Sequence, residues 1–468
     1  MNRKRRHLTI VGGGITGLTA AYYLQKGIAR QSLSLDFTLL EASNRLGGKV
    51  QTDVHNGFVM EKGPDSFLAR KASAVELVKD LGMENQLVRN RTGQSYILHR
   101  NRLCPIPEGA VMGVPTRLLP FVRSSLFSPA GKVRAAFDLI LPRSNMSGDQ
   151  SVGHFFRRRL GNEAVDHLIE PLLSGIYAGD IDKLSLMSTF PQFYKLEKEH
   201  RSLILAMKQS RKLSTRKEKP KGQFLTLKTG LQSMVEAIES ELPRQSVMKS
   251  VALQSIEKDG EGYRLHLSDG RHLHTDAVIL AVPGPIASKV LKPPSASHTL
   301  ADVAPTSVAT VVLAYSKTSV RLEHEGTGFV VPRKENYTIT ACTWTHKKWP
   351  HTTPDGKALI RCYVGRAGDD SIVDQSDDAI ITSVLHDLKR ILDISGDPEF
   401  CRITRWKDAM PQYTVGHRSR VEKLKRHLDT HFPGIVLAGA AYEGIGIPDC
   451  IQQGKTAAEQ TLRYVMAQ

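Results

Sequence analysis

The sequence predicts an α/β protein whose N-terminal part forms a buried parallel sheet covered by helices. Three neighbouring segments support this fold class. Leu8–Val11 is a β-branched run of the kind found in buried parallel strands, Gly12–Gly17 is rich in glycine, and Leu18–Lys26 is expected to be helical. Strand, glycine turn and helix in this order form the first half of a βαβ unit.

Length and composition indicate a globular chain with more than one domain. The chain has 468 residues, of which 40% are apolar and 24% charged, close to the average of soluble proteins. A chain of this length is too long for a single ordinary core. We therefore expect two or three domains, each with an apolar interior of its own.

The charge balance predicts anionic partners. Lysine and arginine outnumber aspartate and glutamate by 64 to 47, and the resulting net charge of +17 attracts anions in general. A polycarboxylate substrate and an anionic membrane surface both fit this charge. No helix-turn-helix, zinc-finger or RNA-binding signature is present, so we expect no nucleic-acid partner.

The five cysteines, Cys104, Cys342, Cys362, Cys401 and Cys450, are widely spaced and form no CxxC pair. This spacing predicts a reducing, cytoplasmic location and no bound metal. Leu8–Gln25 carries no charge, but its glycines break it near the start, so we expect no transmembrane segment. The basic N-terminus lacks the apolar core of a signal peptide, and we expect an unprocessed chain.

The glycine run has the spacing of a dinucleotide-binding loop. Gly12 permits a tight turn, Gly14 lets the backbone approach a pyrophosphate, and Gly17 allows close packing of helix on strand. The phosphates would then meet the N-terminus of a helix, which favours anions. The residues of this loop expected to contact the cofactor are Gly12, Gly13, Gly14, Ile15, Thr16 and Gly17.

A second predicted strand, Asp36–Leu40, ends at an acidic residue, Glu41. Its carboxylate lies where it could accept hydrogen bonds from the ribose hydroxyls of a dinucleotide. The alternative is an ordinary glycine turn with Glu41 as an exposed acid. Strand, helix and acid occurring together favour the binding interpretation and predict a Rossmann-like domain.

A further glycine pair makes the pattern more specific. The run Glu41–Lys49 contains Gly47-Gly48, which plain NAD dehydrogenases do not usually carry, and it resembles the flavin amine oxidase superfamily. The resemblance implies FAD as the cofactor. It places Ala42, Arg45, Gly48 and Lys49 beside the ADP half of FAD, and Gly63, Pro64, Asp65 and Ser66 near the flavin ring.

Three later segments resemble the same superfamily and imply a discontinuous FAD domain. Leu253–Ile256 is similar to a strand whose first residue, Leu253, contacts adenine, and Asp276–Pro283 is similar to the family's DxVIxAxP strand. Glu443–Pro448 leads into a helix expected to begin near Cys450, and the resemblance places Gly444, Ile445 and Gly446 at the reduced flavin. Trp406 is expected near the flavin, with core packing as the alternative.

The segment Glu170–Asp180 is similar to a signature of protoporphyrinogen oxidases, and Gly63–Phe67 and Ala341–Trp344 agree with it. Over the whole chain the sequence resembles the soluble Gram-positive, Bacillus-type branch of that family. The resemblance implies a six-electron oxidation of coproporphyrinogen III to coproporphyrin III in haem biosynthesis, with molecular oxygen as acceptor and hydrogen peroxide released.

The flavin carries the chemistry in such an enzyme, so we predict no acid–base dyad. Lys71, and with it Arg70, is a candidate anchor for a substrate propionate, although two basic residues can equally belong to a solvated helix start. Gly175 and Ile176 are expected to line the substrate site, with core packing as the alternative. Tyr363 is expected there too if its face of the strand Leu359–Val364 is the right one.

The expected architecture is flavin amine oxidase-like: a discontinuous Rossmann-like FAD-binding domain, a substrate domain with an antiparallel sheet, and a helical domain. The predicted parts are residues 1–65, 225–295 and 395–468 for the FAD-binding domain, 66–75, 205–224 and 296–394 for the substrate-binding domain, and 76–204 for the helical domain.

Two basic segments bear on surface contacts. Arg117–Arg143 mixes apolar and basic residues and could make weak membrane-surface contact, although prolines interrupt it and such faces are often merely solvated. Lys208–Lys221 is expected to be a mobile surface loop. A contact with a ferrochelatase is compatible with the implied pathway, and no residue tests it.

Several other functions share parts of this pattern. A protoporphyrinogen IX oxidase or another flavin amine oxidase would share the cofactor segments and differ in the substrate cavity. A binding protein of the GDP-dissociation-inhibitor type would keep the fold without flavin, but the intact Gly12, Gly14, Gly17 and Glu41 argue against it. An NAD-dependent dehydrogenase is disfavoured by the second glycine pair.

Overall fold

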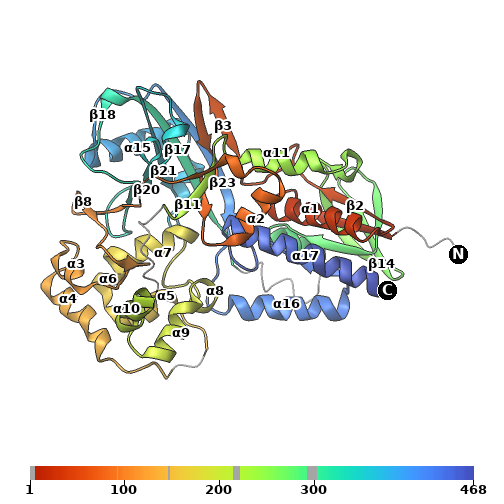
Figure 1. Ribbon diagram of the computed structural model, residues 1–468, viewed down its shortest axis with the longest axis horizontal. Coiled ribbons are helices and arrows are strands. Elements are labelled where there is room, and N and C mark those ends of the chain that lie inside the picture. Colours follow the sequence, from red (N-terminus) through yellow and green to blue (C-terminus); the bar gives the residue numbers. More distant parts are fainter. Residues whose placement is uncertain (1–5, 92, 146–147, 214–221, 292–302) are drawn as a thin grey trace.

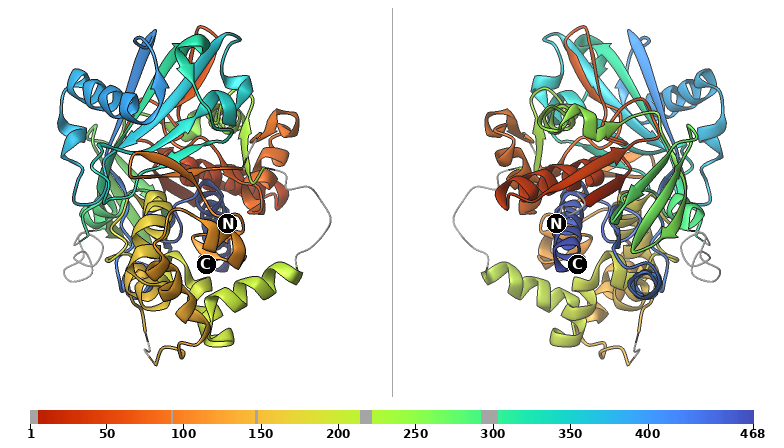
Figure 2. Two further views of the ribbon diagram at one scale, coloured as in Figure 1. Left: turned by 90° about the vertical axis from the view of Figure 1, so that its left-hand side faces the viewer. Right: turned by 90° about the vertical axis from the view of Figure 1, so that its right-hand side faces the viewer.

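The protein is described from a computed structural model of residues 6–91, 93–145, 148–213, 222–291 and 303–468. Figure 1 shows three regions: a parallel sheet with its helices on the right, a large sheet at the upper left and a helical block at the lower left. In Figure 2 the large sheet and the helical block again lie at opposite ends, above and below the parallel sheet.

The parallel sheet has five strands. Their order is β12 (Val247–Met248), β2 (Leu35–Leu40), β1 (Arg6–Val11), β16 (Ala277–Leu280) and β24 (Ile435–Leu437). Val11 is in register with Leu40 on one side and Leu280 on the other. The carboxyl ends of these three strands therefore meet at one edge, where ligands bind in open α/β sheets.

Helices and a small meander cover the two faces of this sheet, which explains its largely apolar strands. One face carries α1 (Ile15–Arg30), α2 (Ala72–Asp80), α11 (Gln232–Glu241) and α17 (Ile447–Ala467). The other face carries the meander β13 (Leu253–Asp259), β14 (Gly262–Leu267) and β15 (His272–Thr275), together with α12 (Gly284–Leu291) and α16 (His417–His431).

The elements predicted for this region are confirmed. The two N-terminal strands are β1 and β2, and the predicted adenine strand forms the first part of β13. The predicted C-terminal helix is α17, which begins at Ile447, three residues before Cys450. Helix α17 packs closely on α1 at Gly454, where a built Cβ would be only 2.3 Å from the Thr16 carbonyl oxygen.

The large sheet has seven strands, which extend beyond the segment predicted for it. Their order is β23 (Phe400–Met410), β17 (Thr306–Ser316), β21 (Lys357–Val364), β20 (Ile339–Trp344), β19 (Gly328–Val330), β7 (Tyr96–His99) and β8 (Arg102–Pro105). Pairing is antiparallel except between β19 and β7, which are parallel. The expected antiparallel sheet thus includes one parallel pair, and α15 (Asp377–Ile391) packs on one of its faces.

The helical block has its own apolar core. Its elements are α3 (Leu118–Arg123), α4 (Pro129–Ala136), η2 (Phe137–Leu139), α5 (Val152–Leu160), α6 (Asn162–Ala164), the π-helical turn η3 (Val165–Ile169), α7 (Glu170–Tyr177), α8 (Leu186–Thr189), α9 (Pro191–His200) and α10 (Leu203–Leu213). No helix in the described ranges is both long and apolar enough to span a membrane.

One predicted loop is partly wrong. The segment Lys208–Lys221 begins inside α10, because the apolar residues Leu203–Met207 start a helix that the polar residues after them continue. Residues 214–221 lie outside the described ranges. Strands β7 and β8 come from the segment expected to be helical, and β23 from the segment assigned to the FAD domain. The domain boundaries themselves stay a prediction.

Short elements join these regions. The strands are β3 (Thr52–His55), β4 (Phe58–Glu61), β5 (Phe67–Leu68), β6 (Leu87–Arg89), β9 (Ala110–Val111), β10 (Val114–Pro115), β11 (Phe224–Leu227), β18 (Val320–Arg321) and β22 (Asp393–Ile394). The helical turns are η1 (Glu84–Gln86), η4 (Arg244–Ser246), η5 (Lys317–Ser319), α14 (Thr345–Lys348), η6 (Pro350–Thr352) and η7 (Ser371–Asp374).

Candidate functional site

A large cavity lies where the parallel sheet, the seven-stranded sheet and the helical block meet. Its volume is about 2860 Å³, and its walls include residues from β1, β21, α7 and the start of α17. Pockets for a single drug-sized ligand measure roughly 300–1,000 Å³. This cavity therefore has room for a cofactor and a second ligand together.

The glycine loop after β1 borders this cavity, and its geometry explains the glycine spacing. Gly12 has a φ of +104°, and a Cβ built on it would lie 2.5 Å from the Ala281 carbonyl oxygen. A Cβ on Gly17 would lie 1.9 Å from the Gly12 carbonyl oxygen. Around Gly14, in contrast, no atom of the described chain comes within 4 Å of a built Cβ, so this backbone stays open to the cavity.

The first turn of α1 follows directly. The helix begins at Ile15 with Gly14 as its N-cap, and no described side chain caps it. Its first backbone N–H groups therefore remain available for an anion. An open glycine backbone beside a helix N-terminus fits the pyrophosphate of FAD.

The Gly47-Gly48 pair packs against the glycine loop that follows β1. Gly47 donates its backbone N–H to the Gly13 carbonyl oxygen over 2.8 Å. Arg45 spans this turn and donates hydrogen bonds to the carbonyl oxygens of Gly48, at 3.0 Å, and Val50, at 3.1 Å. Two glycine runs more than thirty positions apart are thus joined at the cavity edge.

Glu41 holds the two loops together through its carboxylate. Oε2 accepts the Gly13 N–H at 2.6 Å, while Oε1 accepts the Ser43 N–H at 2.8 Å and the Ser43 hydroxyl at 2.7 Å. A carboxylate has about four lone-pair positions, so Glu41 can accept a further hydrogen bond from a ribose hydroxyl. Its side chain lines the cavity.

The start of α17 forms another part of the wall. Gly446 is its N-cap, again without a capping side chain in the described chain, and Ile445 and Gly446 line the cavity. Asp449, in the first turn, pairs with Lys71 at 2.5 Å. Lys71, the candidate propionate anchor, is the N-cap of α2 and lines the cavity, but it already has a carboxylate partner.

Cys450 stands in the same turn, and burial raises the pKa of its thiol to about 11. The thiol is therefore protonated at neutral pH, which agrees with the packing role expected for it. All five cysteines are free. No cluster of at least three potential metal ligands occurs in the described ranges.

The Gly63–Ser66 segment is pressed against the glycine turn. A Cβ on Gly63 would lie 1.9 Å from the Lys49 carbonyl oxygen, and Gly63, Pro64 and Ser66 line the cavity. The Asp65 side chain instead points behind the wall, where it accepts hydrogen bonds from Lys348 Nζ at 2.8 Å and Trp349 Nε1 at 3.3 Å. The Asp65 carboxylate therefore does not face this cavity, and the predicted cofactor contact of Asp65 would have to come from its backbone.

The candidate substrate residues line the cavity away from the glycine loop. Gly175 and Ile176, on α7, face it, and Ile176 is 47% exposed rather than packed in a core. Tyr363, on β21, also faces it, which settles the strand face that the sequence left open. Trp406 lines it from β23 and donates its indole N–H to the Lys62 carbonyl oxygen at 3.0 Å.

Most of the predicted site residues therefore share one cavity. Those that line it are Gly12, Gly14, Ile15, Thr16, Glu41, Ala42, Arg45, Gly48, Lys49, Gly63, Pro64, Ser66, Lys71, Gly175, Ile176, Leu253, Tyr363, Trp406, Ile445 and Gly446. Gly13, Gly17, Asp65 and Gly444 are absent from its lining. Their roles toward a cofactor or substrate stay predictions.

Sequence reasoning missed several basic residues of the wall. Ten lysines and arginines line the cavity, against four carboxylates. Those not predicted from the sequence include Arg89, Lys289, Lys348, Arg366, Lys407 and Arg420. They come from segments without a motif, and only the net positive charge of the chain hinted at them.

Known proteins are similar in sequence to this chain over its whole length. Residues 15–462 match the model of the family described as flavin containing amine oxidoreductase. The chain is 54% identical to the coproporphyrinogen III oxidase of Bacillus subtilis (strain 168), with 100% of both chains covered. It is 43% identical to the protein of that name from Staphylococcus aureus, over 98% of this chain and 99% of that one.

A solved structure agrees with the fold. A crystal structure from Exiguobacterium sp. 255-15, provisionally assigned as a protoporphyrinogen oxidase, superposes with a TM-score of 0.88 at 40% identity and covers 98% of this chain and 99% of that one. These matches confirm the predicted resemblance, the fold class and FAD as the cofactor. The chain belongs to the flavin containing amine oxidoreductase family.

Proposed function

We propose that this protein oxidises coproporphyrinogen III to coproporphyrin III in haem biosynthesis, a six-electron reaction that uses oxygen and releases hydrogen peroxide. The observation that carries the proposal is the full-length similarity to two proteins named coproporphyrinogen III oxidase. The cavity supports it, because it is large and its lining has more cationic than anionic side chains. Bound FAD supplies the redox chemistry by accepting two electrons at a time and passing them to oxygen.

For the cofactor, the chain offers backbone groups, one acid and one aromatic side chain. We propose that Gly12–Thr16 and the N-terminus of α1 hold the pyrophosphate, since this backbone is open and uncapped. Glu41 would bind the ribose. Leu253 would contact adenine, and Trp406 would pack near the flavin, because both line the cavity.

For the substrate, the chain offers an apolar slot with cations at its edge. Gly175, Ile176 and Tyr363 would contact the macrocycle. Lys71 would exchange its ion pair with Asp449 for one with a propionate, which costs little because the pair is partly exposed. Four propionates on coproporphyrinogen suit a cation-rich wall better than the two on protoporphyrinogen, which remains the second candidate.

The test is a steady-state comparison. Purified, aerated protein would receive anaerobically prepared coproporphyrinogen III or protoporphyrinogen IX, while porphyrin fluorescence is followed. We expect a flavin spectrum and a higher kcat/KM for coproporphyrinogen III. A preference for protoporphyrinogen IX would move the function to that substrate, and oxidation of neither would contradict the porphyrinogen assignment. A colourless protein would indicate a flavin-less binding protein.

We also propose a cytoplasmic location with weak contact at an anionic membrane surface. Leu119 and Val122 on α3, and Ile140 directly after η2, are exposed by more than half of their surface. Arg117 and Arg123 stand at the two ends of α3. Apolar side chains next to cations favour an anionic lipid surface. Sedimentation with phosphatidylserine vesicles tests it: binding that salt weakens is expected, and no sedimentation would contradict it.

A further inference from the structure

A buried arginine, Arg361, lies directly behind the wall of the main cavity. It is 3% exposed and stands on β21, two residues before Tyr363. Residues two apart in a strand share a face, and the Arg361 guanidinium carbon lies 4.9 Å from the centre of the Tyr363 ring. Arg361 therefore packs beside a side chain that faces the cavity.

The same guanidinium holds the backbone that enters the Gly63–Ser66 segment. Nη2 donates a hydrogen bond to the Gly63 carbonyl oxygen and lies 3.5 Å from that of Lys62. The Lys62 carbonyl oxygen also accepts hydrogen bonds from Thr310 Oγ1 at 2.9 Å and Trp406 Nε1 at 3.0 Å. Since Gly63 is pressed against Lys49 on its other side, the segment is held from both directions.

Charged groups around Arg361 are matched in number. The cations Arg361 and Lys348 face the carboxylates of Asp65 and Glu61. Burial alone would raise the pKa of Asp65, but Lys348 and Arg361 hold it below its usual range. For Glu61 burial prevails and raises the pKa to about 7, although Arg361 and hydrogen bonds from Leu231 and Thr52 act in the opposite direction.

A second, small cavity lies beside three of these groups, Glu61, Asp65 and Arg361. Its volume is about 20 Å³, and Glu61, Asp65, Thr345 and Arg361 are among the residues that line it. Arg361 Nε and Nη1 and Thr345 Oγ1 are buried and have no hydrogen-bond partner in the described chain. A cavity of roughly 10–15 Å³ with several polar partners is enough for one water molecule, and buried donors are normally satisfied.

We propose that Arg361 is a positioning residue that fixes the Gly63–Ser66 segment and Tyr363 in the cavity wall, and that one water molecule binds in the small cavity against Arg361. Arg361 acts through the Gly63 carbonyl group and the Tyr363 ring, because its own side chain is absent from the lining of the main cavity. The inference rests on the proposed role of Gly63–Ser66 beside the flavin and is independent of the substrate.

The test compares Arg361→Lys with a matched control, Arg159→Lys. Arg159 is equally buried but lies in the helical block, outside the lining of the cavity. Lysine keeps the charge and loses the planar fork. We expect Arg361→Lys to weaken flavin binding about tenfold or more, and to change the absorption spectrum of the bound flavin. Arg159→Lys is expected to lower Tm while its flavin Kd stays within about twofold of wild type.

Equal flavin affinities and spectra for wild type and folded Arg361→Lys would overturn the positioning role. If Arg361→Lys does not fold, Thr310→Val decides, because it removes one donor to the Lys62 carbonyl oxygen and keeps the side-chain shape. It is expected to weaken flavin binding by roughly threefold or more, and an unchanged Kd would overturn the proposal. A wild-type protein without flavin affinity would instead contradict the proposed function.

The water site has its own readout. A crystal structure of the flavin-loaded protein is expected to show one ordered water within hydrogen-bond distance of Arg361 Nε or Nη1. In Thr345→Val, which loses one polar lining atom at nearly constant shape, this water is expected to have lower occupancy. Absence of ordered density from the wild-type cavity would overturn this part of the proposal.

Discussion

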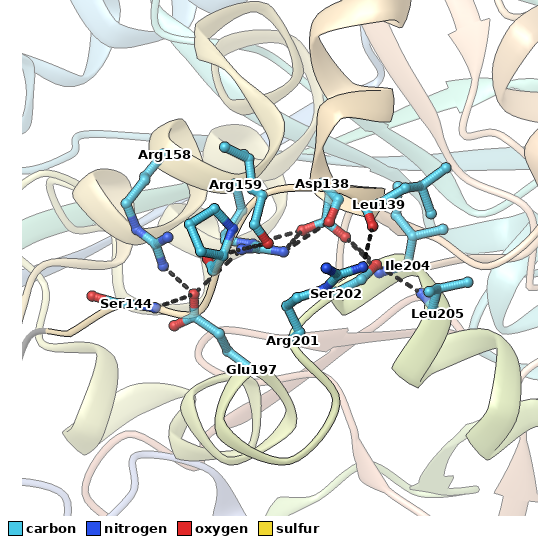
Figure 3. Close-up of polar contacts among 12 residues, drawn as sticks. Asp138, Leu139, Ser144, Arg158, Arg159, Glu197, Arg201, Ser202, Ile204 and Leu205 are labelled. Carbon is cyan, nitrogen blue, oxygen red and sulfur yellow. Dashed lines mark hydrogen bonds and ion pairs between the residues drawn. The ribbon is translucent and has the colours of Figure 1, made fainter.

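The glycine loops beside β1 and the helical block are held by opposite means. In the loops, missing side chains fix the backbone: Gly12 and Gly17 stand where any Cβ would collide with a carbonyl group. In the helical block, ion pairs between buried charged side chains hold the segments together. Arg159 is fully buried and donates from Nε to Asp138 Oδ1 at 2.6 Å and from Nη2 to the Asp138 carbonyl oxygen at 2.9 Å (Figure 3).

The charge cluster extends to two other segments, residues 202–204 and α9. Asp138 Oδ2 also accepts hydrogen bonds from the Ser202 hydroxyl at 2.7 Å and the Ile204 N–H at 3.0 Å. Glu197, likewise fully buried, accepts from Arg158 (Figure 3). The comparison teaches that the cofactor edge depends on backbone space, whereas the helical block depends on ion pairs between buried side chains.

The largest expected loss of stability comes from a substitution that breaks the Arg159–Asp138 ion pair. Arg159→Met leaves the Asp138 carboxylate buried without its cation, and we expect it to lower the free energy of unfolding by about 3–5 kcal/mol. Urea unfolding of the flavin-loaded protein measures this. A loss below about 1 kcal/mol would show that the cluster does not hold the helical block.

The next largest effect is on the pH dependence of stability, and it comes from the buried acid Glu61. Because the pKa of Glu61 is raised from its ordinary 4.5 to about 7, the folded state binds this proton more tightly than the unfolded state. Its stabilising contribution is complete below pH 4.5 and is lost as the pH rises through 7, a change of about 3 kcal/mol. Glu61→Gln is expected to remove this part of the pH dependence of unfolding, whereas an identical slope in both proteins would contradict it.

Two glycines of the loop after β1, Gly17 and Gly14, test whether space around the backbone holds the cofactor edge. Gly17→Ala places a Cβ against the Gly12 carbonyl oxygen, and we expect about 1–3 kcal/mol of destabilisation together with weakened flavin binding. Gly14→Ala meets open space and is expected to weaken flavin binding alone. Flavin titration and urea unfolding separate the two effects, and equal stability losses in both variants would contradict the assignment.

The smallest stability effect is expected for the partly exposed Lys71–Asp449 pair. Its side chains are 40% and 28% exposed, so Lys71→Met should cost no more than about 1 kcal/mol. If Lys71 anchors a propionate, KM for coproporphyrinogen III should rise about tenfold while flavin binding is unchanged. Asp449→Asn serves as the control, because it frees Lys71 and should not raise KM.

The sequence predicted the backbone-driven region well. Strand β1, the glycine turn, α1 and β2 follow one another in sequence, so their periodicity and spacing are readable directly. Arg361 and Lys348 were missed because their partners, at Gly63 and Asp65, lie almost three hundred positions away. Tyr363 could be placed on a strand but not on a face, since its strand is buried on both sides over most of its length.

The most direct test of the central claim is an anaerobic single turnover. Wild-type protein with its flavin oxidised would be mixed with coproporphyrinogen III in the absence of oxygen, and the visible flavin absorption followed. The account predicts that the flavin band bleaches on mixing and that porphyrin fluorescence develops when oxygen is admitted. A flavin band that stays unchanged with saturating coproporphyrinogen III would contradict the account.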